Sequence, residues 1–195
     1  MVNIPNTLSC LRLIIAPLLL YFAWNGRATL FLIFFIIALI TDCLDGYIAR
    51  KLNQTSELGA RLDSLGDNFI YVSVPLSIWW LRPDIIQRED VWVSIVLFSY
   101  ALPVICGFLK FKRLISYHTW GAKLSAVLLS VSIVLMMING PSLPFRIASL
   151  VFLLTAIEEI SMTFILPLWQ ADVPSLIHAI RIRKSLLTFK GNSSQ

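Results

Sequence analysis

The sequence predicts an all-α polytopic membrane protein with six transmembrane helices, an N-terminal interfacial segment and cytoplasmic N and C termini. Of its 195 residues, 57% are hydrophobic and only 14% are charged, whereas a soluble domain has about 45–50% apolar and about 25% charged residues. The apolar residues form long runs separated by turn-forming residues, and the basic residues gather on one side of the resulting topology. These observations exclude a soluble globular domain, a disordered chain and a disulfide scaffold.

Six apolar runs define the predicted helices. They cover residues 13–24, 28–41, 69–81, 91–109, 124–138 and 147–168. A helix that spans a membrane needs about 20 residues, so the shorter runs reach full length only by including polar neighbours. Residues 42–50 extend the second helix, and residues 62–68 precede the third. Turns are predicted at 25–26, 82–84 and 139–141, where asparagine, glycine and proline gather.

Basic residues orient these helices, because cytoplasmic loops carry an excess of lysine and arginine. With the N-terminus inside, twelve bases lie inside and four outside. The inside set is Arg12, Arg50, Lys51, Arg61, Lys110, Lys112, Arg113, Lys123, Arg181, Arg183, Lys184 and Lys190; the outside set is Arg27, Arg82, Arg88 and Arg146. Topology therefore explains the net charge of +5. No nucleic-acid partner is predicted, because most aromatic residues lie within the apolar runs.

The two ends of the chain carry separate predictions. The opening Pro5-Asn6-Thr7 has the composition of a capped helix start that lies partly in the membrane interface. Residues 174–184 predict a short basic amphipathic helix within a basic C-terminal tail, 174–195. No internal repeat is visible, so a single membrane domain is predicted over 1–195.

Four aspartates form the constellation that carries chemistry. Asp42 and Asp45 are three residues apart, and therefore share one face of a helix. Asp63 and Asp67 are four apart and share a face of the next helix. The loop 51–58 lets the two helices run antiparallel and bring the four carboxylates together. Such a cluster near hydrocarbon requires cations, and carboxylate oxygens favour magnesium, manganese or calcium over zinc.

Small residues surround these carboxylates. Gly46 and Ala49 follow the first aspartate pair by one turn, and Gly59 precedes the second pair by one turn. Their missing side chains leave room for a ligand to approach the backbone. Arg50, one turn beyond Gly46, can pair with a phosphate. Divalent cations, space left by small residues and an arginine together indicate a nucleoside diphosphate substrate and phosphoryl transfer.

The pattern Asp-x2-Asp-Gly-x2-Ala-Arg-x8-Gly-x3-Asp-x3-Asp, at residues 42–67, resembles the complete signature of the CDP-alcohol phosphotransferases. The resemblance implies a metal-dependent enzyme that transfers a phosphatidyl group from CDP-diacylglycerol to a small polar alcohol and releases CMP. It also implies helices that enclose a polar cavity open to the cytoplasm and to lipid, and a homodimer. The localisation expected is a bacterial inner membrane, with the active site facing the cytoplasm.

The resemblance also implies roles for individual residues. Two divalent ions, Mg²⁺ with Mn²⁺ as an alternative, would be held by Asp42, Asp45, Asp63 and Asp67. Asp67 would in addition be the general base that takes the acceptor's proton. The residues implied to bind the donor are Pro5, Asn6, Thr7, Gly46, Ala49, Arg50, Ser56 and Gly59.

Five basic residues flank the predicted fourth and fifth helices: Lys110, Lys112, Arg113, His118 and Lys123. They are either a pocket for an anionic acceptor or the ordinary basic excess of a cytoplasmic face. If they form a pocket, Lys110, Arg113 and Lys123 are the expected acceptor-binding residues. Lys123 is the strongest candidate, because it opens a helix that is apolar beyond it.

The acceptor alcohol is the least determined part of the prediction. The Ile-Pro-Asn opening resembles phosphatidylglycerophosphate synthases, which makes glycerol 3-phosphate the leading acceptor. The Asp63-Ser64-Leu65 run is closer to phosphatidylserine-synthase-like relatives, so serine, inositol and inositol phosphate stay open. A further alternative is transfer from CDP-choline or CDP-ethanolamine to diacylglycerol.

Two other classes of function are weighed against an enzyme. A transporter could use buried acids as an ion path, but here the aspartate pairs lie on two helices only and no repeat is visible. A non-catalytic scaffold of the same fold would not need all four carboxylates. Glu158 and Glu159 interrupt the last apolar run. They are predicted either to reach the polar cavity or to pair with an interior lysine.

Overall fold

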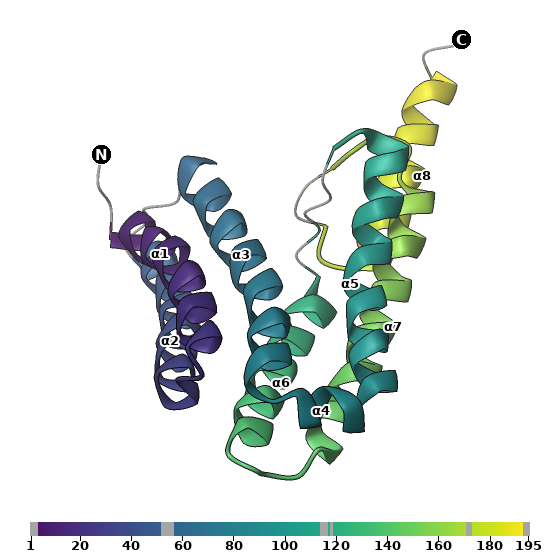
Figure 1. Ribbon diagram of the computed structural model, residues 1–195. Coiled ribbons are helices and arrows are strands. Elements are labelled where there is room, and N and C mark those ends of the chain that lie inside the picture. Colours follow the sequence, from purple (N-terminus) through teal and green to yellow (C-terminus); the bar gives the residue numbers. More distant parts are fainter. Residues whose placement is uncertain (1–3, 52–56, 114–116, 118, 171–172, 193–195) are drawn as a thin grey trace. The chain divides into compact units, whose positions relative to one another are not determined.

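The computed structural model describes residues 4–51, 57–113, 117, 119–170 and 173–192, and in these ranges every regular element is a helix. The chain divides into two compact units, residues 1–88 and 89–195. Figure 1 shows the helices of each unit. The prediction of a single domain over the whole chain stays a prediction.

Unit 1 contains three long helices and one short one. They are α1 (Ile4–Trp24), α2 (Ala28–Lys51), α3 (Glu57–Leu81) and α4 (Pro83–Arg88). Helix α1 packs against both α2 and α3. Ile15, Ala16 and Leu19 of α1 are buried, as are Phe31 of α2 and Val74 of α3. The unit is therefore built around α1.

The turn between α1 and α2 lies where the sequence predicts it. Gly26 has φ of +67°, a left-handed conformation that glycine adopts without steric cost. At the same end of the unit, the rings of Trp24 and Trp80 meet edge to face with centroids 5.1 Å apart. Both tryptophans are exposed, as expected for side chains at a membrane interface.

Unit 2 is organised around its third helix. Its elements are α5 (Asp90–Phe111), α6 (Trp120–Met137), α7 (Leu143–Ile165) and α8 (Leu176–Asn192), and α7 packs against the other three. Small and hydroxylated residues line the packing of α6 on α7. A Cβ added at Gly121 would lie 2.8 Å from Thr155 Oγ1, and Ser125 Oγ lies 3.1 Å from the same atom. Such residues let membrane helices approach closely.

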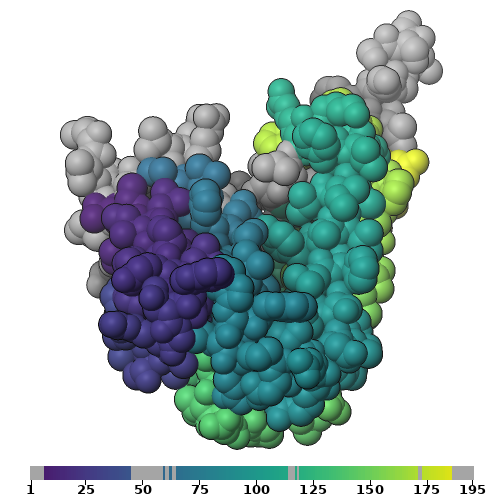
Figure 2. All heavy atoms as spheres, in the orientation of Figure 1, coloured from purple at the N-terminus to yellow at the C-terminus, as the bar shows by residue number. Residues whose placement is uncertain are grey.

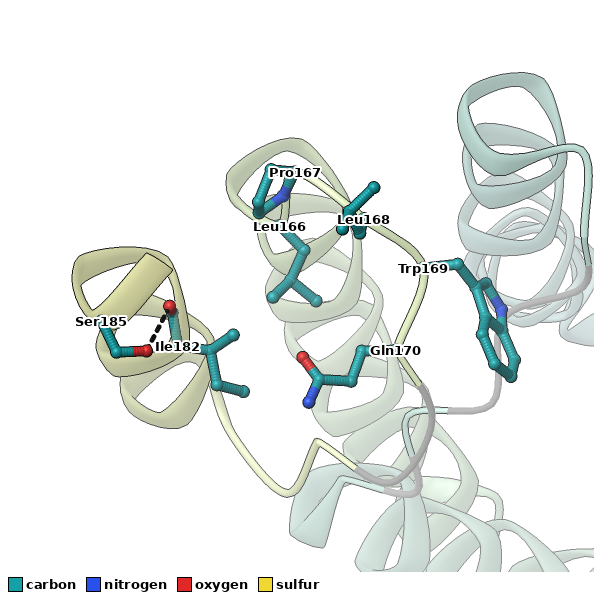
Figure 3. Close-up of a pocket in the computed structure, with 7 residues that line it drawn as sticks. All are labelled: Leu166, Pro167, Leu168, Trp169, Gln170, Ile182 and Ser185. Carbon is teal, nitrogen blue, oxygen red and sulfur yellow. Dashed lines mark hydrogen bonds between the residues drawn. The ribbon is translucent and has the colours of Figure 1, made fainter. Parts of the chain in front are cut away.

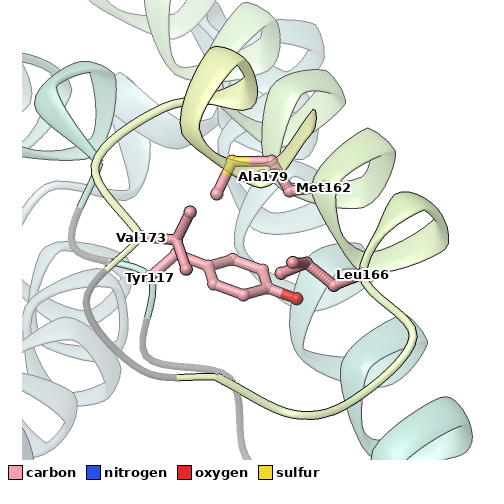
Figure 4. Packing of buried hydrophobic residues seen from close by; sticks show 5 residues of the cluster. All are labelled: Tyr117, Met162, Leu166, Val173 and Ala179. Carbon is pink, nitrogen blue, oxygen red and sulfur yellow. The ribbon is translucent and has the colours of Figure 1, made fainter. Parts of the chain in front are cut away.

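A buried cluster joins the segments at one end of unit 2. It contains Tyr117, Met162, Leu166, Val173 and Ala179, which come from four different parts of the chain (Figure 4). The Tyr117 hydroxyl lies 3.0 Å from Thr163 Oγ1. This cluster packs Tyr117, Val173 and Ala179 of α8 against the end of α7.

Within the part of the chain that the structure describes, four helical segments are long and apolar enough to cross a membrane. They are Thr7–Trp24, Asp90–Phe111, Trp120–Met137 and Leu143–Ile165, with a shorter apolar segment at Ala28–Leu44. Their outward side chains are large and apolar, including Tyr21 of α1, Leu154 of α7 and Phe164 of α7. Figure 2 shows the outward side chains of α1 and α2, in purple and blue, as one continuous surface of unit 1. The protein is an integral membrane protein.

The six apolar runs each form a helix, but their bounds differ from the predicted ones. Helix α2 extends to Lys51 and α3 begins at Glu57, so the polar neighbours are helical as predicted, and residues 51, 57 and 58 of the predicted loop are helical as well. The N-terminal segment is not a separate element, because α1 runs unbroken from Ile4 and Pro5 fits a first helical turn. The predicted break at 82–84 contains the start of α4, and α8 is longer than the predicted 174–184.

Candidate active site

Arg12 brings together two aspartates of the signature. Its side chain, on α1, is only 1% exposed. Its Nη1 donates a 2.6 Å hydrogen bond to Oδ1 of Asp42 on α2, and its Nε lies 3.6 Å from Oδ1 of Asp67 on α3. The first and last aspartates of the signature therefore face one guanidinium. They are partly open to their surroundings, with side chains 51% and 31% exposed.

A glycine beside Asp67 makes room for this arrangement. A Cβ added at Gly66 would lie 3.3 Å from Arg12 Cβ, 3.4 Å from Arg12 Nε and 3.4 Å from the Ser9 carbonyl oxygen. Helix α3 can therefore approach α1 where the guanidinium lies. Neither Gly66 nor Arg12 was among the predicted site residues. The available signal was a single arginine within an apolar run, which in a membrane helix is a functional hypothesis by default.

The charges of this cluster favour a cation. A buried arginine is costly unless acids compensate it, and two carboxylates at one place require a positive group. Arg12 meets both needs, but two carboxylates and one guanidinium still leave one formal negative charge. The donor atoms are carboxylate oxygens, which suit a hard divalent cation. Asp42 and Asp67 thus fit the metal site that the sequence predicts.

The remaining predicted ligands lie outside what the structure describes. Within the described side chains, no group of three or more potential metal ligands is assembled. The predicted site residues that lie outside the described side chains are Asp45, Asp63, Gly46, Ala49, Arg50, Pro5, Asn6 and Ser56. Thr7 is exposed and Gly59 is half-buried. The metal and donor roles of all these residues stay predictions.

In unit 2, Lys110 holds the end of α7. Its Nζ donates to the carbonyl oxygens of Thr163, Phe164 and Leu166, at 2.9, 3.1 and 2.9 Å. These carbonyls have no partner within a helix, and a cation is favourable at that end of the helix dipole. The contacts account for the three donors of the ammonium group and compete with the predicted role in acceptor binding.

The other two predicted acceptor-binding residues are exposed cations. The Arg113 guanidinium lies over the Trp169 ring at 5.6 Å, and Lys123 Nζ lies over the Trp120 ring at 5.5 Å. A cation–π contact of this kind orients a side chain without neutralising its charge. Arg113 and Lys123 therefore keep positive charge available for an anionic ligand.

The two glutamates of α7 have partners other than lysine. Glu158 Oε1 accepts a 3.0 Å hydrogen bond from the backbone N–H of Leu176, the first residue of α8. The Glu159 side chain lies close to Thr119. Thr119 is also the N-cap of α6, where its Oγ1 accepts from the Ala122 N–H. Both glutamates thus connect α7 to the start of a neighbouring helix.

Tyr117 lies close to these groups. Burial raises the pKa of its hydroxyl, and the Glu159 carboxylate raises it further, against the opposing effect of the hydrogen bond with Thr163. The hydroxyl therefore stays protonated over the whole neutral range.

A cavity of about 460 Å³ opens between the end of α7 and α8. Figure 3 shows its lining, which is Leu166, Pro167, Leu168, Trp169, Gln170, Ile182 and Ser185. The Ser185 hydroxyl donates to the Ile182 carbonyl oxygen at 2.8 Å. None of the described residues that line this cavity is an acid, a base or a signature residue.

Comparison with known proteins identifies the family. The family model described as CDP-alcohol phosphatidyltransferase matches residues 2–168, across both units. No solved structure matches. Among curated proteins, a CDP-diacylglycerol–glycerol-3-phosphate 3-phosphatidyltransferase of Aquifex aeolicus is 45% identical over 65 residues, which are 33% of this chain and 36% of the relative.

Two further relatives differ from each other in name. One from Wigglesworthia glossinidia brevipalpis, with the same name as the Aquifex protein, is 43% identical over 110 residues, covering 47% of this chain and 60% of the relative. One from Mycobacterium tuberculosis, provisionally named a cardiolipin synthase, is 35% identical over 98 residues, covering 45% of this chain and 46% of the relative. The matches thus span between about a third and three-fifths of these relatives. The family model covers most of the present chain, and the chain therefore belongs to the CDP-alcohol phosphatidyltransferase family.

Proposed function

We propose that this protein transfers a phosphatidyl group from CDP-diacylglycerol to a hydroxyl of glycerol 3-phosphate, with release of CMP. The observation that carries the proposal is the meeting of Asp42 and Asp67 at Arg12, since these aspartates are the two ends of the family signature. The names of the Aquifex and Wigglesworthia relatives support the acceptor.

The signature aspartates supply the metal ligands of the proposed enzyme. Asp42, Asp45, Asp63 and Asp67 would hold two divalent cations, Mg²⁺ or, as an alternative, Mn²⁺. When bound, the cations neutralise the pyrophosphate of the donor and stabilise CMP as a leaving group. Asp42 and Asp67 support this role because both present carboxylate oxygens at one place in unit 1.

The chemical step needs one general base. Asp67 takes the proton from the acceptor hydroxyl, and the hydroxyl oxygen forms a bond to the phosphorus that carries diacylglycerol. The bond from that phosphorus to the bridging oxygen breaks, and CMP leaves with its electron pair. A base positioned in this way contributes typically 10²–10⁴-fold to a rate. Asp67 is suited to the role because its side chain is partly exposed.

Donor and acceptor would be bound by different parts of the chain. Gly46, Ala49 and Gly59 leave space for cytidine, Arg50 meets a phosphate, and polar contacts come from Pro5, Asn6, Thr7 and Ser56. Lys123 and Arg113 are the proposed partners of the acceptor phosphate, and both are exposed cations. Lys110 is a weaker candidate, because three carbonyl oxygens already engage it.

The same proposal includes the setting of the enzyme. Six membrane-spanning helices would place both termini and the active site on the cytoplasmic side of a bacterial inner membrane, and the protein would act as a homodimer. The asymmetry of twelve bases against four supports this orientation. The bacterial sources of the relatives support the membrane.

The first experiment measures CMP release by the purified protein in detergent, with Mg²⁺ and CDP-diacylglycerol. Glycerol 3-phosphate, serine, inositol, inositol phosphate and choline are offered one at a time, and the lipid products are identified by mass spectrometry. We expect fast release with glycerol 3-phosphate alone. Release with another of these acceptors would replace the acceptor in this proposal. If none of them gives release, CDP-choline is supplied with diacylglycerol, and release from that pair alone would reverse donor and acceptor.

A further inference from the structure

We propose that Arg12 is a positioning residue of the metal site, which holds Asp42 and Asp67 in the arrangement that receives divalent cations. This inference rests on the proposed function, because it assigns Arg12 a task toward the metal that the signature implies. Arg12 lies outside the signature, thirty residues before Asp42 in the chain.

The contacts of Arg12 are those that orient a ligand. Its Nη1 donates a hydrogen bond to Oδ1 of Asp42, and its Nε lies in ion-pair range of Oδ1 of Asp67. Carboxylates that bind metals are themselves commonly held by hydrogen bonds, and loss of such a partner typically weakens metal binding about 10–100-fold. Arg12 therefore sets the direction of two ligands that come from two different helices.

The identity of this residue matters as much as its charge. Two different nitrogens, Nη1 and Nε, face the two aspartates. The planar guanidinium presents donors in several directions at once and stays charged when buried, whereas the lysine ammonium is a point charge. With its side chain 1% exposed, Arg12 is also confined by its surroundings. A lysine at this position would not reach both carboxylates from the same place.

A substitution at Gly66 offers a second, independent way to test the position of the Arg12 side chain. A Cβ at residue 66 would lie 3.4 Å from Arg12 Nε, the atom that faces Asp67, and 3.3 Å from Arg12 Cβ. The contact with Arg12 Cβ is tight and the contact with Nε is close to ordinary van der Waals distance, so a Gly66→Ala variant would shift the arginine by a few tenths of an ångström without removing any charge. The Gly66→Ala variant should therefore bind the metal more weakly, by a smaller factor than a variant that lacks Arg12.

The test measures Mn²⁺ binding by electron paramagnetic resonance, with purified full-length protein and no substrate. The variants are Arg12→Met, Arg12→Lys and Gly66→Ala. Arg27→Met is the matched control, because Arg27 is an exposed arginine of unit 1 beside the turn at Gly26. We expect about 10–100-fold weaker Mn²⁺ binding for Arg12→Met, a smaller loss for the other two variants, and no change in the control. Thermal unfolding of each metal-free protein is measured in parallel.

The outcomes separate this inference from two alternatives. If Arg12→Met lowers the unfolding temperature but binds Mn²⁺ like the unchanged protein, Arg12 is only a structural ion pair. If the variant binds Mn²⁺ more tightly, Arg12 competes with the metal. Either result overturns the inference. Should Arg12→Met fail to fold, Arg12→Lys and Gly66→Ala decide in the same way.

A failure of the proposed function would look different. If the unchanged protein does not bind Mn²⁺, or if Asp42→Asn and Asp67→Asn leave binding unaffected, the metal site itself is wrong and the inference falls with it. If the protein binds Mn²⁺ with the expected dependence on Arg12 but releases no CMP with any acceptor, the positioning role stands and the proposed reaction fails.

Discussion

The Arg12 cluster of unit 1 and the Lys110–Glu158 region of unit 2 use charged residues in opposite ways. Arg12 contacts the side chains of two acids. Lys110 donates to three backbone carbonyl oxygens, and Glu158 accepts from a backbone N–H. Side-chain partners can exchange for a ligand, whereas unpaired backbone groups at helix ends always need a partner. The partner of a charged residue in a membrane helix therefore indicates its role, and this comparison supports the proposal that the chemistry takes place in unit 1.

The strongest test of the comparison is Asp67→Asn. The change keeps the size of the side chain but removes the base, so kcat for CMP release should fall by about 10²–10⁴-fold. Mn²⁺ binding should be lost only in part, since the other ligands remain. Asp84→Asn is the control, because Asp84 is an exposed aspartate outside the signature that pairs with Arg82. A near-normal kcat for Asp67→Asn would show that Asp67 is not the general base.

Arg146→Met probes a unit 2 charge that does contact a side chain. Arg146 donates to both carboxylate oxygens of Glu89, at 2.8 and 3.1 Å, and Glu89 is fully buried. Removing the arginine should lower the unfolding temperature, because it takes a guanidinium away from the buried Glu89 carboxylate. Thermal unfolding measures this, while kcat should not change. A fall in kcat at unchanged stability would show that Arg146, and therefore unit 2, contributes to the reaction.

Lys110→Met and Lys123→Met sharpen the comparison within unit 2. Loss of Lys110 leaves the end of α7 without its ammonium partner and should cost about 1–2 kcal/mol of stability, with little effect on the KM for glycerol 3-phosphate. Loss of Lys123 should raise that KM and leave stability unchanged. Each variant serves as the control for the other, in unfolding and in steady-state kinetics. The reverse pattern would make Lys110 the acceptor-binding residue.

Tyr117→Phe should give the smallest effect. The change removes the hydrogen bond with Thr163 and should cost about 0.5–1.5 kcal/mol in the free energy of unfolding. Because burial raises the pKa of Tyr117, its contribution is fully present below about pH 10 and is lost as the pH rises through the higher pKa of the folded protein. The difference between the two proteins should therefore shrink in alkaline solution. A difference that stays constant to pH 11 would contradict this account.

The helices could be predicted from the sequence because apolar runs are local. Even the polar extensions of α2 and α3 follow from the length that a spanning helix needs. Spacing also placed Asp42 and Asp45, or Asp63 and Asp67, on common helix faces. The structure adds that Asp42 and Asp67, on different helices, approach one guanidinium.

The missed residues are those whose partners lie far away in the chain. Arg12 appears in the sequence as one basic residue within an apolar run, and its partners belong to α2 and α3. Lys110 is separated from Thr163 by 53 residues, so its capping role could not be distinguished from an acceptor pocket. Glu158 likewise finds its partner in α8. Helical periodicity identifies neighbours within one helix and gives no information on such contacts.

The edge-to-face pair of Trp24 and Trp80 gives a reference point for the depth of the proposed site in a membrane. Arg12 precedes Trp24 by twelve residues of one helix, and Asp67 precedes Trp80 by thirteen, so both lie about 18–20 Å from the tryptophans along α1 and α3. If the tryptophans mark one boundary of a hydrocarbon core about 30 Å thick, the carboxylates lie about 10–12 Å inside the other boundary. A lipid donor would reach them with its acyl chains still in the bilayer, whereas a water-soluble acceptor would have to descend below the head groups.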